Sequence, residues 1–374
     1  MFNQTPKLTN KLFTLHWLFW QGLFYQGQFW RGLFWQAVMK PLFTVIAVLL
    51  VVMPSFASDD ATIIMYHRFG ESNLPSTNIQ LDVFDAHLQT IRDEGWTVLP
   101  LSEIVSKLKS GETLPDKALA ITIDDAFTSV YTEAFPRLQA YDYPFTIFVA
   151  TQSIDRGLNG YASWDQIREM QAAGVEIGSQ SHTHPHMHRL SADQTRQEIK
   201  TSNTRFYEEL GERPLLFAYP YGEYSPEVRD IIKASGFEAA FGQASGVAHA
   251  SIDAFEWPRF AFNENYGDVS RLTLAVEARA LPISDMTNGD MVLSNNPPYL
   301  GFTVAEGIEP LSRLICFASG MGRVDVIQLD RRIEVRLPRP FSNYRSRINC
   351  TMPVVENGQD TGRFRWYSRQ FVLN

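Results

Sequence analysis

An alternation of short apolar segments with amphipathic segments, between residues 62 and 242, most constrains how this chain can fold. The apolar segments have the length and composition of buried β-strands; they cover residues 62–67, 96–101, 118–124, 144–150, 175–180, 215–221 and 239–242. The segments between them have helical patterning, and Leu81, Phe84, Leu88 and Ile91 lie on one helical face that Gly95 closes. Roughly seven strand–helix units in series predict an α/β fold whose parallel sheet closes into a barrel.

Several of the predicted helices carry their own start and stop signals. Ser-Trp-Asp-Gln at 163–166 and Ser-Ala-Asp-Gln at 191–194 have the pattern of capping boxes. Ser225 followed by Pro226 predicts another helix start, and Gly236 predicts the end of that helix. The barrel domain is expected to span residues 58–275.

The C-terminal residues 281–374 lose the helical pattern. Alternating segments predict antiparallel strands of a small β-domain of unknown role; they cover residues 324–330, 332–337, 347–355 and 363–373. Cys316 and Cys350, the only two cysteines of the chain, both lie there, and in an oxidising compartment they are expected to form a disulfide. Two interpretations of Trp366 and Tyr367 stay open, as polysaccharide-binding side chains or as core.

Residues 1–57 are expected to be a leader and signal peptide outside the fold. Met39-Lys40, an apolar run over residues 42–53 and the end Ser55-Phe56-Ala57 form the pattern of a secretory signal. The run is shorter than the ~20 residues of a membrane span. We expect cleavage after Ala57, no stable membrane span afterwards, and a periplasmic or secreted protein, with an uncleaved anchor as the alternative. Residues 1–38 could also be upstream reading frame that is not part of the functional protein.

Polar side chains gather where the predicted strands end. Asp124 and Asp125 end the third strand, the segment with His182, His184, His186 and His188 follows the fifth, and "FAYPYGEY" ends the sixth. In barrels of this kind the chemistry lies at the carboxyl ends of the strands. Carboxylate and imidazole at one rim predict a site for Zn²⁺ or a similar divalent ion, which would polarise a carbonyl and lower the pKa of a bound water. The Asp pair could instead cap the following helix.

Four motifs in order carry a resemblance to a known family. "MYHRF" at 65–69, "TIDDA" at 122–126, the histidine-rich segment after "EIGS" and "FAYPYGEYS" at 217–225 resemble the polysaccharide deacetylases, carbohydrate esterase family 4 or the NodB-homology domain, over roughly residues 60–270. The resemblance implies a distorted (β/α) barrel that removes acetyl groups from sugars with a divalent metal held by one Asp and two His. It also implies that Asp124 is the general base, that Asp125 is a metal ligand, and that the Tyr221 backbone N–H binds the oxyanion.

The histidine segment departs from the family pattern His-Ser/Thr-x-x-His. Alignment on the strand end and Pro185 places Gln180 at the first ligand position and His184 at the second; this is the register we prefer. Alignment on the letters His-Thr-x-x-His selects His182 and His186 instead. In the first register a third ligand could come from His182, His186 or His188, because a Gln carbonyl is a poorer Zn²⁺ ligand than imidazole.

Two further family features are missing. The family often has an Arg ahead of the Pro-Tyr-Gly turn, where this chain has Ala218, and the family's late Leu-x-His motif has no clean match. Our candidates for the substrate pocket are His67, Trp164, Pro220, Arg259 and His249. Trp164 fits equally well as a helix-start residue, and Arg259 could contact the substrate, the base or only solvent.

The sequence leaves two functions open. The first is an exported metal-dependent hydrolase that removes acetyl groups from a polysaccharide such as an N-acetylglucosamine polymer, with an Asp base activating a metal-bound water. The alternative is a carbohydrate-binding protein on an eroded deacetylase scaffold; the intact Asp124-Asp125 pair favours the enzyme. The net charge of −8 argues against a nucleic-acid partner, because phosphate binding needs clustered Lys and Arg.

The signal-peptide interpretation predicts the N-terminus of the mature protein. N-terminal sequencing of protein recovered from the cell envelope should begin near Ser58, because the small-x-Ala pattern ends at Ala57. Residues 1–38 found intact on the mature protein would contradict it.

Overall fold

The computed structural model describes residues 57–287 and 289–373, which belong to one compact unit. The predicted leader and signal peptide lie outside the described residues, apart from their last one, Ala57. Among the helices of this described part, none has the length and apolar character needed to span a bilayer.

The barrel sheet follows the path β11-β10-β9-β8-β7-β2-β12. The bounds of these strands are β2 Asp60–Tyr66, β7 Ala118–Asp124, β8 Phe145–Val149, β9 Glu176–Ser179, β10 Leu216–Ala218, β11 Ala239–Phe241 and β12 Val247–His249. Neighbouring strands from β2 to β11 are all parallel, as the alternation predicts. Two short strands, β5 Thr97–Val98 and β13 Phe260–Ala261, pair in parallel with β7 and β2.

Strand β12 is the unexpected member of this sheet, because it runs antiparallel to β2. It ends the path opposite β11, so the barrel is curled and distorted, which confirms the predicted fold class. Short strands outside this sheet form two small pairs: β1 Ala57–Ser58 with β6 Leu114–Pro115, and β3 Arg68–Phe69 with β4 Asn78–Ile79.

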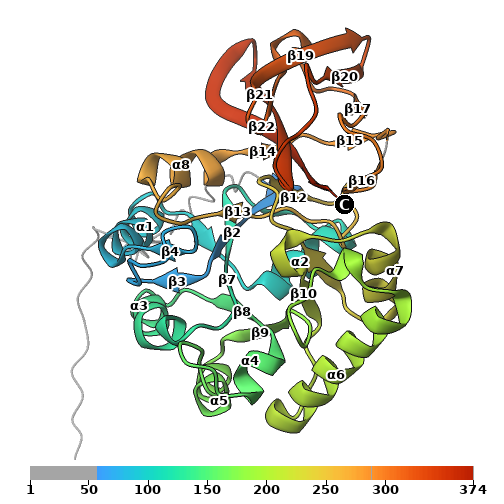
Figure 1. The fold of residues 1–374 in the computed structure, drawn as a ribbon. Coiled ribbons are helices and arrows are strands. Elements are labelled where there is room, and N and C mark those ends of the chain that lie inside the picture. Colours follow the sequence, from blue (N-terminus) through green and yellow to red (C-terminus); the bar gives the residue numbers. More distant parts are fainter. Residues whose placement is uncertain (1–56, 288, 374) are drawn as a thin grey trace, which may run out of the picture. The chain divides into compact units, whose positions relative to one another are not determined.

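Helices surround the barrel sheet (Figure 1). Their bounds are α1 Leu81–Asp93, α2 Leu101–Ser110, α3 Phe135–Ala140, α4 Thr151–Asp155, α5 Trp164–Ala172, α6 Ala192–Leu210, α7 Pro226–Ala234 and α8 Val269–Glu277. Ser163 and Ser191 form the predicted capping boxes, and Ser225 accepts a hydrogen bond from the Val228 N–H. Gly95 and Gly236 have positive φ beyond the ends of α1 and α7, where a side chain would be strained.

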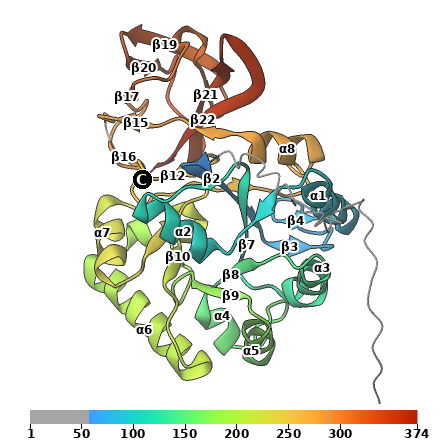
Figure 2. The same ribbon diagram turned by 180° about the vertical axis from the view of Figure 1, so that it is seen from behind.

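The C-terminal segment folds into a second, mainly antiparallel sheet beside β12, β13 and α8, as both views show (Figures 1 and 2). Its strands are β14 Arg279–Ala280, β15 Ile283–Ser284, β16 Val292–Leu293, β17 Leu300–Val304, β18 Ile315–Ala318, β19 Gly322–Leu329, β20 Arg332–Arg336, β21 Arg345–Glu356 and β22 Gln359–Leu373. The four predicted strand segments correspond to β19, β20, β21 and β22, and these pair antiparallel. The C-terminal β-rich region is therefore confirmed.

The two cysteines lie opposite each other on β18 and β21. Cys316 and Cys350 are register partners with Cα atoms 4.1 Å apart, and they form the expected disulfide. Both are fully buried in the core of this sheet. The bond ties an inner strand to the long β21–β22 hairpin. Closing a loop of this size adds roughly 3 kcal/mol to the free energy of unfolding.

Strand β22 packs the C-terminal sheet directly on the barrel. The Trp366 indole stands edge-on to Phe260 of β13, with ring centroids 5.3 Å apart. Val372, near the end of the same strand, is buried in a cluster with Phe217 of β10 and with Tyr219, which directly follows β10. Trp366 therefore has a packing role, although one of its faces also borders the cavity described below.

A buried histidine connects α1 to the segment before α8. His87 is fully buried; its Nδ1 lies 2.8 Å from the Tyr66 hydroxyl and its Nε2 lies 2.6 Å from the Gly267 carbonyl. A neutral imidazole satisfies both contacts, since the hydroxyl can donate to Nδ1 while Nε2–H donates to the carbonyl. Burial lowers the pKa of His87 to about 4, which favours this neutral form.

The depressed pKa predicts a loss of stability in mild acid. Below the ordinary pKa of 6.5 the unfolded chain gains a proton at His87 that the folded protein does not take up until about pH 4. The free energy of unfolding should therefore fall by up to ~3 kcal/mol from this group as the pH drops from 7 to 4. Urea unfolding should show a shallower pH slope for His87→Gln; identical slopes would contradict the assignment, whatever the difference in stability at pH 7.

Candidate active site

The carboxyl ends of β2, β7 and β9, together with the turn after β10, border one cavity of about 580 Å³. Its volume lies within the range of roughly 300–1,000 Å³ typical of ligand sites. Four of the predicted site residues line it: His67, Asp125, His184 and Tyr221. The parallel register brings them together, because residues that follow aligned strand ends meet at one rim.

Asp124 lies beneath this rim and is held by Arg259. Both side chains are fully buried, and the guanidinium donates two hydrogen bonds to the carboxylate, at 2.7 and 2.8 Å. Arg259 also donates from Nε to the Gly242 carbonyl at 3.0 Å. The planar guanidinium matches the carboxylate in the bidentate geometry that Arg prefers, so the orientation of Asp124 is fixed.

Asp125 turns from the strand toward the cavity. Its φ of 73° reverses the chain, and its N–H donates to the Phe148 carbonyl at 3.0 Å. Its carboxylate is 19% exposed. The pKa of Asp125 is raised to about 6; burial is the main cause, His67 opposes it, and the adjacent carboxylate of Asp124 adds to it. A cation at this position would stabilise the ionised form.

Of the four histidines in the segment, His184 is the one whose ring lies within 4.0 Å of Asp125 in the described structure. Its Nε2 lies 3.4 Å from Oδ1 of Asp125, too far for a good hydrogen bond here, and it is buried with no hydrogen-bond partner. Burial lowers the pKa of His184 to about 4, so the ring is neutral near pH 7 with one nitrogen free to bind a ligand. A buried acceptor facing a carboxylate in this way fits a divalent cation.

Gln180 contacts the backbone of Asp125. It is fully buried, and its Oε1 accepts a hydrogen bond of 3.3 Å from the Asp125 N–H, while its Nε2 has no partner. Across residues 57–287 and 289–373, no three His, Cys, Asp or Glu side chains are grouped as a metal site. The candidate donors are therefore one carboxylate, one imidazole and one amide.

The other three histidines contact different partners. His182 Nδ1 lies 2.8 Å from the Thr151 hydroxyl at the start of α4. His186 Nδ1 lies 2.6 Å from Oε2 of Glu223, and His188 Nδ1 lies 3.5 Å from the same atom. Each ring therefore has a neighbour other than the Asp125 carboxylate, in the arrangement that the structure describes.

Tyr221 forms the cavity edge from the turn after β10. Its φ of 60° places it in the left-handed region, inside the short 3₁₀ segment Pro220–Gly222. Its ring lies 4.5 Å from His184 and 4.3 Å from His186, measured between ring centroids. Pro220 is buried behind it and does not line the cavity.

The remaining pocket candidates separate into one that lines the cavity and two that do not. His67 does, with Nε2 4.0 Å from Oδ2 of Asp124. Trp164 is buried as the first residue of α5, and its indole N–H donates to Asp155. This placement agrees with a helix-start residue and not with a residue of the cavity. His249 pairs with Asp60 at the amino end of β2, opposite the end that leads to His67, and this placement removes it from the expected pocket.

Glu223 and β21 are the site neighbours that sequence reasoning missed. Glu223 is fully buried and accepts two hydrogen bonds from Arg345 of β21, at 3.0 and 2.8 Å, besides its contacts with two histidines. Arg345, Arg347 and Asn349 alternate along β21 and all line the cavity. The period-two pattern of Arg-Ser-Arg-Ile-Asn-Cys was the available signal, since it gives one strand a polar and an apolar face.

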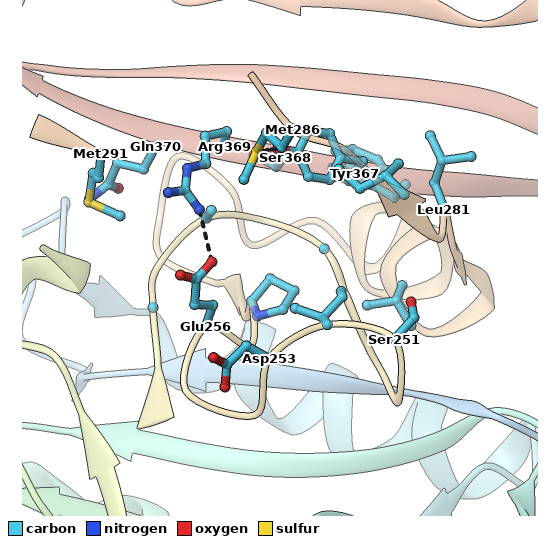
Figure 3. Close-up of a pocket in the computed structure, with 18 of the residues that line it drawn as sticks. Ser251, Asp253, Glu256, Leu281, Met286, Met291, Tyr367, Ser368, Arg369 and Gln370 are labelled. Atoms are coloured by element: carbon cyan, nitrogen blue, oxygen red, sulfur yellow. Dashed lines mark hydrogen bonds and ion pairs between the residues drawn. The ribbon is translucent and has the colours of Figure 1, made fainter. Parts of the chain in front are cut away.

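A second, smaller cavity of about 210 Å³ lies between β22 and the loops that follow β11 and β12 (Figure 3). Arg369 spans it to Glu256 with an Nη1–Oε2 distance of 3.1 Å, drawn as a dashed line in Figure 3. Trp366 and Tyr367, whose role the sequence left open, line this cavity, but none of the predicted catalytic or metal-binding residues does. It is a gap within the packing of the C-terminal sheet on the barrel.

Comparison with known proteins agrees with the geometry. Residues 111–240, which include Asp124, Asp125 and the histidine segment, match the polysaccharide deacetylase family. The putative polysaccharide deacetylase YxkH of Bacillus subtilis is 27% identical over 186 residues, 50% of this chain and 65% of that protein. The poly-beta-1,6-N-acetyl-D-glucosamine N-deacetylase of Escherichia coli K12 is 23% identical over 234 residues, 51% of this chain and 34% of that protein.

A solved structure shares both the fold and part of the sequence. The Streptococcus pyogenes deacetylase PplD, in complex with acetate, superposes with a TM-score of 0.54 and 25% identity, over 58% of this chain and 98% of that one. The chain spans less than two thirds of the two curated relatives described above. The Asp124–Asp125 pair lies at the rim of the curled barrel, inside the region of residues 111–240 that matches the polysaccharide deacetylase family.

Proposed function

We propose that this chain is an exported, metal-dependent hydrolase that removes acetyl groups from a polysaccharide containing N-acetylglucosamine. One observation carries the proposal: Arg259 holds Asp124, and the next residue, Asp125, lines the cavity with its carboxylate 3.4 Å from the unpartnered Nε2 of His184. Base and ligand candidates are thus adjacent and oriented. The named activities of the relatives support this reaction and this sugar.

In the proposed reaction, Asp124 takes a proton from a water that attacks the acetyl carbonyl carbon. A bond forms between the water oxygen and that carbon, and the bond from the carbon to the sugar nitrogen then breaks. The nitrogen leaves as an amine by taking up a proton, which balances the one that Asp124 received. Arg259 holds the carboxylate in one orientation, since it donates to both oxygens. The backbone N–H of Tyr221, at the cavity edge, is the candidate donor to the oxygen that gains negative charge.

Asp125 and His184 are the residues that would hold a divalent ion, with Gln180 as a weaker third donor. Such an ion supplies a Lewis acid that polarises the carbonyl and activates water. The donor set of one carboxylate, one imidazole and one amide oxygen suits Zn²⁺ less well than a site with two imidazoles. We therefore infer a weakly held divalent ion.

Export is the remaining part of the proposal. The signal pattern before Ser58 and the Cys316–Cys350 disulfide support a periplasmic or secreted location, because disulfides persist in oxidising compartments. An acetylated polysaccharide of the cell envelope would be accessible there. The alternative, a binding protein on an eroded scaffold, rests on Gln180 at a ligand position.

Replacement of the base tests the reaction. Asp124→Asn keeps the shape of the side chain but cannot accept the proton, so acetate release from an N-acetylglucosamine oligomer should fall by ~10²–10⁴-fold. Asp193→Asn, on the exposed face of α6, is the matched control and should release acetate as the wild type does. Both are compared at a temperature where thermal unfolding shows them folded. Wild type that releases no acetate but binds the oligomer would favour the binding protein.

Metal retention tests the ligand assignment independently of turnover. His184→Ala removes the imidazole whose Nε2 lies 3.4 Å from Oδ1 of Asp125, and equilibrium dialysis against Zn²⁺ should show loss of the bound ion. His182→Ala is the control, because its ring contacts Thr151 and the ion should stay. Gln180→His should tighten binding. Retention in His184→Ala together with loss in His182→Ala and His186→Ala would move the register by two residues.

A further inference from the structure

One wall of the cavity comes from the C-terminal sheet and is rich in arginine. Arg345, Arg347 and Asn349 alternate along β21 and line it, while the intervening Ile348 and Cys350 point into the core of that sheet. A third guanidinium, that of Arg271, reaches the same cavity from the first turn of α8. Asp125 is the one carboxylate among the residues that line this cavity in the described structure.

Two of these three arginines lack a compensating charge. Arg345 is paired with the buried Glu223 at 2.8 Å. Within residues 57–287 and 289–373, no carboxylate lies within ion-pair distance of Arg271 or Arg347. The guanidinium of Arg347 donates one hydrogen bond, from Nε to Gln370, and the Nε of Arg271 is buried without a partner.

Partial burial of the Arg271 and Arg347 guanidiniums without a paired anion is energetically unfavourable. Burial lowers the pKa of Arg347, and the nearby guanidiniums of Arg345 and Arg271 lower it further. Burial also lowers the pKa of Arg271, whose guanidinium carbon lies 5.2 Å from the centroid of the Tyr266 ring. Half-buried cations are usually paired with an anion, because desolvation of an unpaired charge is unfavourable.

We propose that Arg271 and Arg347 form a subsite for an oxyanion carried by the polysaccharide, next to the acetylated sugar whose carbonyl faces Asp125. The substrate is then an acidic polymer, in which N-acetylglucosamine alternates with a sugar that bears a carboxylate or with a phosphodiester. This inference rests on the proposed deacetylase function and specifies its substrate.

The geometry of the groups matches this ligand. The Nη groups of both arginines have no protein acceptor among the described residues, and a planar guanidinium binds a carboxylate or phosphate through two parallel hydrogen bonds. The subsite and the Asp125–His184 pair line the same cavity of about 580 Å³, so one chain segment can reach both. A fully deacetylated, cationic glucosamine polymer would be repelled by the same wall.

The test compares three oligosaccharides of equal length. One is a neutral N-acetylglucosamine tetramer, one alternates N-acetylglucosamine with glucuronate, and one joins N-acetylglucosamine units by phosphodiesters. Acetate release gives kcat/KM for each, and calorimetry gives Kd. We expect the wild type to prefer at least one acidic oligosaccharide by roughly tenfold or more, as hydrogen bonds to charged groups imply, and to lose the preference at high salt. Which acidic oligosaccharide is preferred identifies the anion.

Variants assign the preference to the two arginines. The double variant Arg271→Gln, Arg347→Gln should lose the acidic-to-neutral ratio of kcat/KM, and Arg347→Lys alone should keep part of it because the charge remains. The double control Arg323→Gln, Arg336→Gln, at exposed positions of β19 and β20, removes the same two charges outside the cavity and should keep the full ratio. Thermal unfolding confirms that each variant is folded.

The outcomes separate this inference from the proposed function. Equal kcat/KM on all three oligosaccharides, or a ratio unchanged in the double variant, overturns the subsite while acetate release still supports the deacetylase. Arginine-dependent binding of an acidic oligosaccharide without acetate release from any of the three supports the subsite and overturns the proposed reaction. A stronger preference for the neutral tetramer overturns the acidic substrate.

Discussion

The buried ion pair between Asp124 and Arg259 is the interaction on which the site depends. It joins the end of β7 to the segment before β13, and through the Gly242 carbonyl it also holds the end of β11. Removal of one partner from such a pair typically costs about 3–5 kcal/mol, because the other charge stays buried. An apolar pair would pack there at less cost, so the ion pair is best explained by the need for an oriented carboxylate beneath the rim.

The histidine segment serves two purposes at once. His184 alone faces Asp125, while His186 and His188 surround the buried carboxylate of Glu223 together with Arg345. A buried carboxylate needs several donors, and these come from both the barrel and β21. The cluster around Glu223 therefore couples the position of the histidine segment to the C-terminal sheet.

The C-terminal sheet is part of the site as well as an appendage. Trp366 packs on the barrel at Phe260, and Arg345, Arg347 and Asn349 face the cavity from the neighbouring strand. Period-two alternation makes this possible, because one face of β21 fills the core of the sheet while the other stays polar. In the subsite proposed above, such a wall would add substrate selectivity without any change to the barrel motifs.

The sequence by itself determined the strand–helix alternation, the helix caps, the disulfide and the strand ends at which chemistry gathers, because these depend on local periodicity and on spacing along the chain. It did not determine that β12 runs antiparallel to β2 or that His249 lies at the amino end of β2, away from the site. Nor did it determine that Arg259 supplies the cation beside Asp124, where the family often uses an Arg at the position of Ala218. Only the tertiary structure decided these, since each depends on contacts between residues far apart in the chain. The partners of the four histidines also depend on tertiary contacts, because the spacing of the histidines permits two registers. In the structure His182 contacts Thr151, His186 contacts Glu223, and His184 faces Asp125.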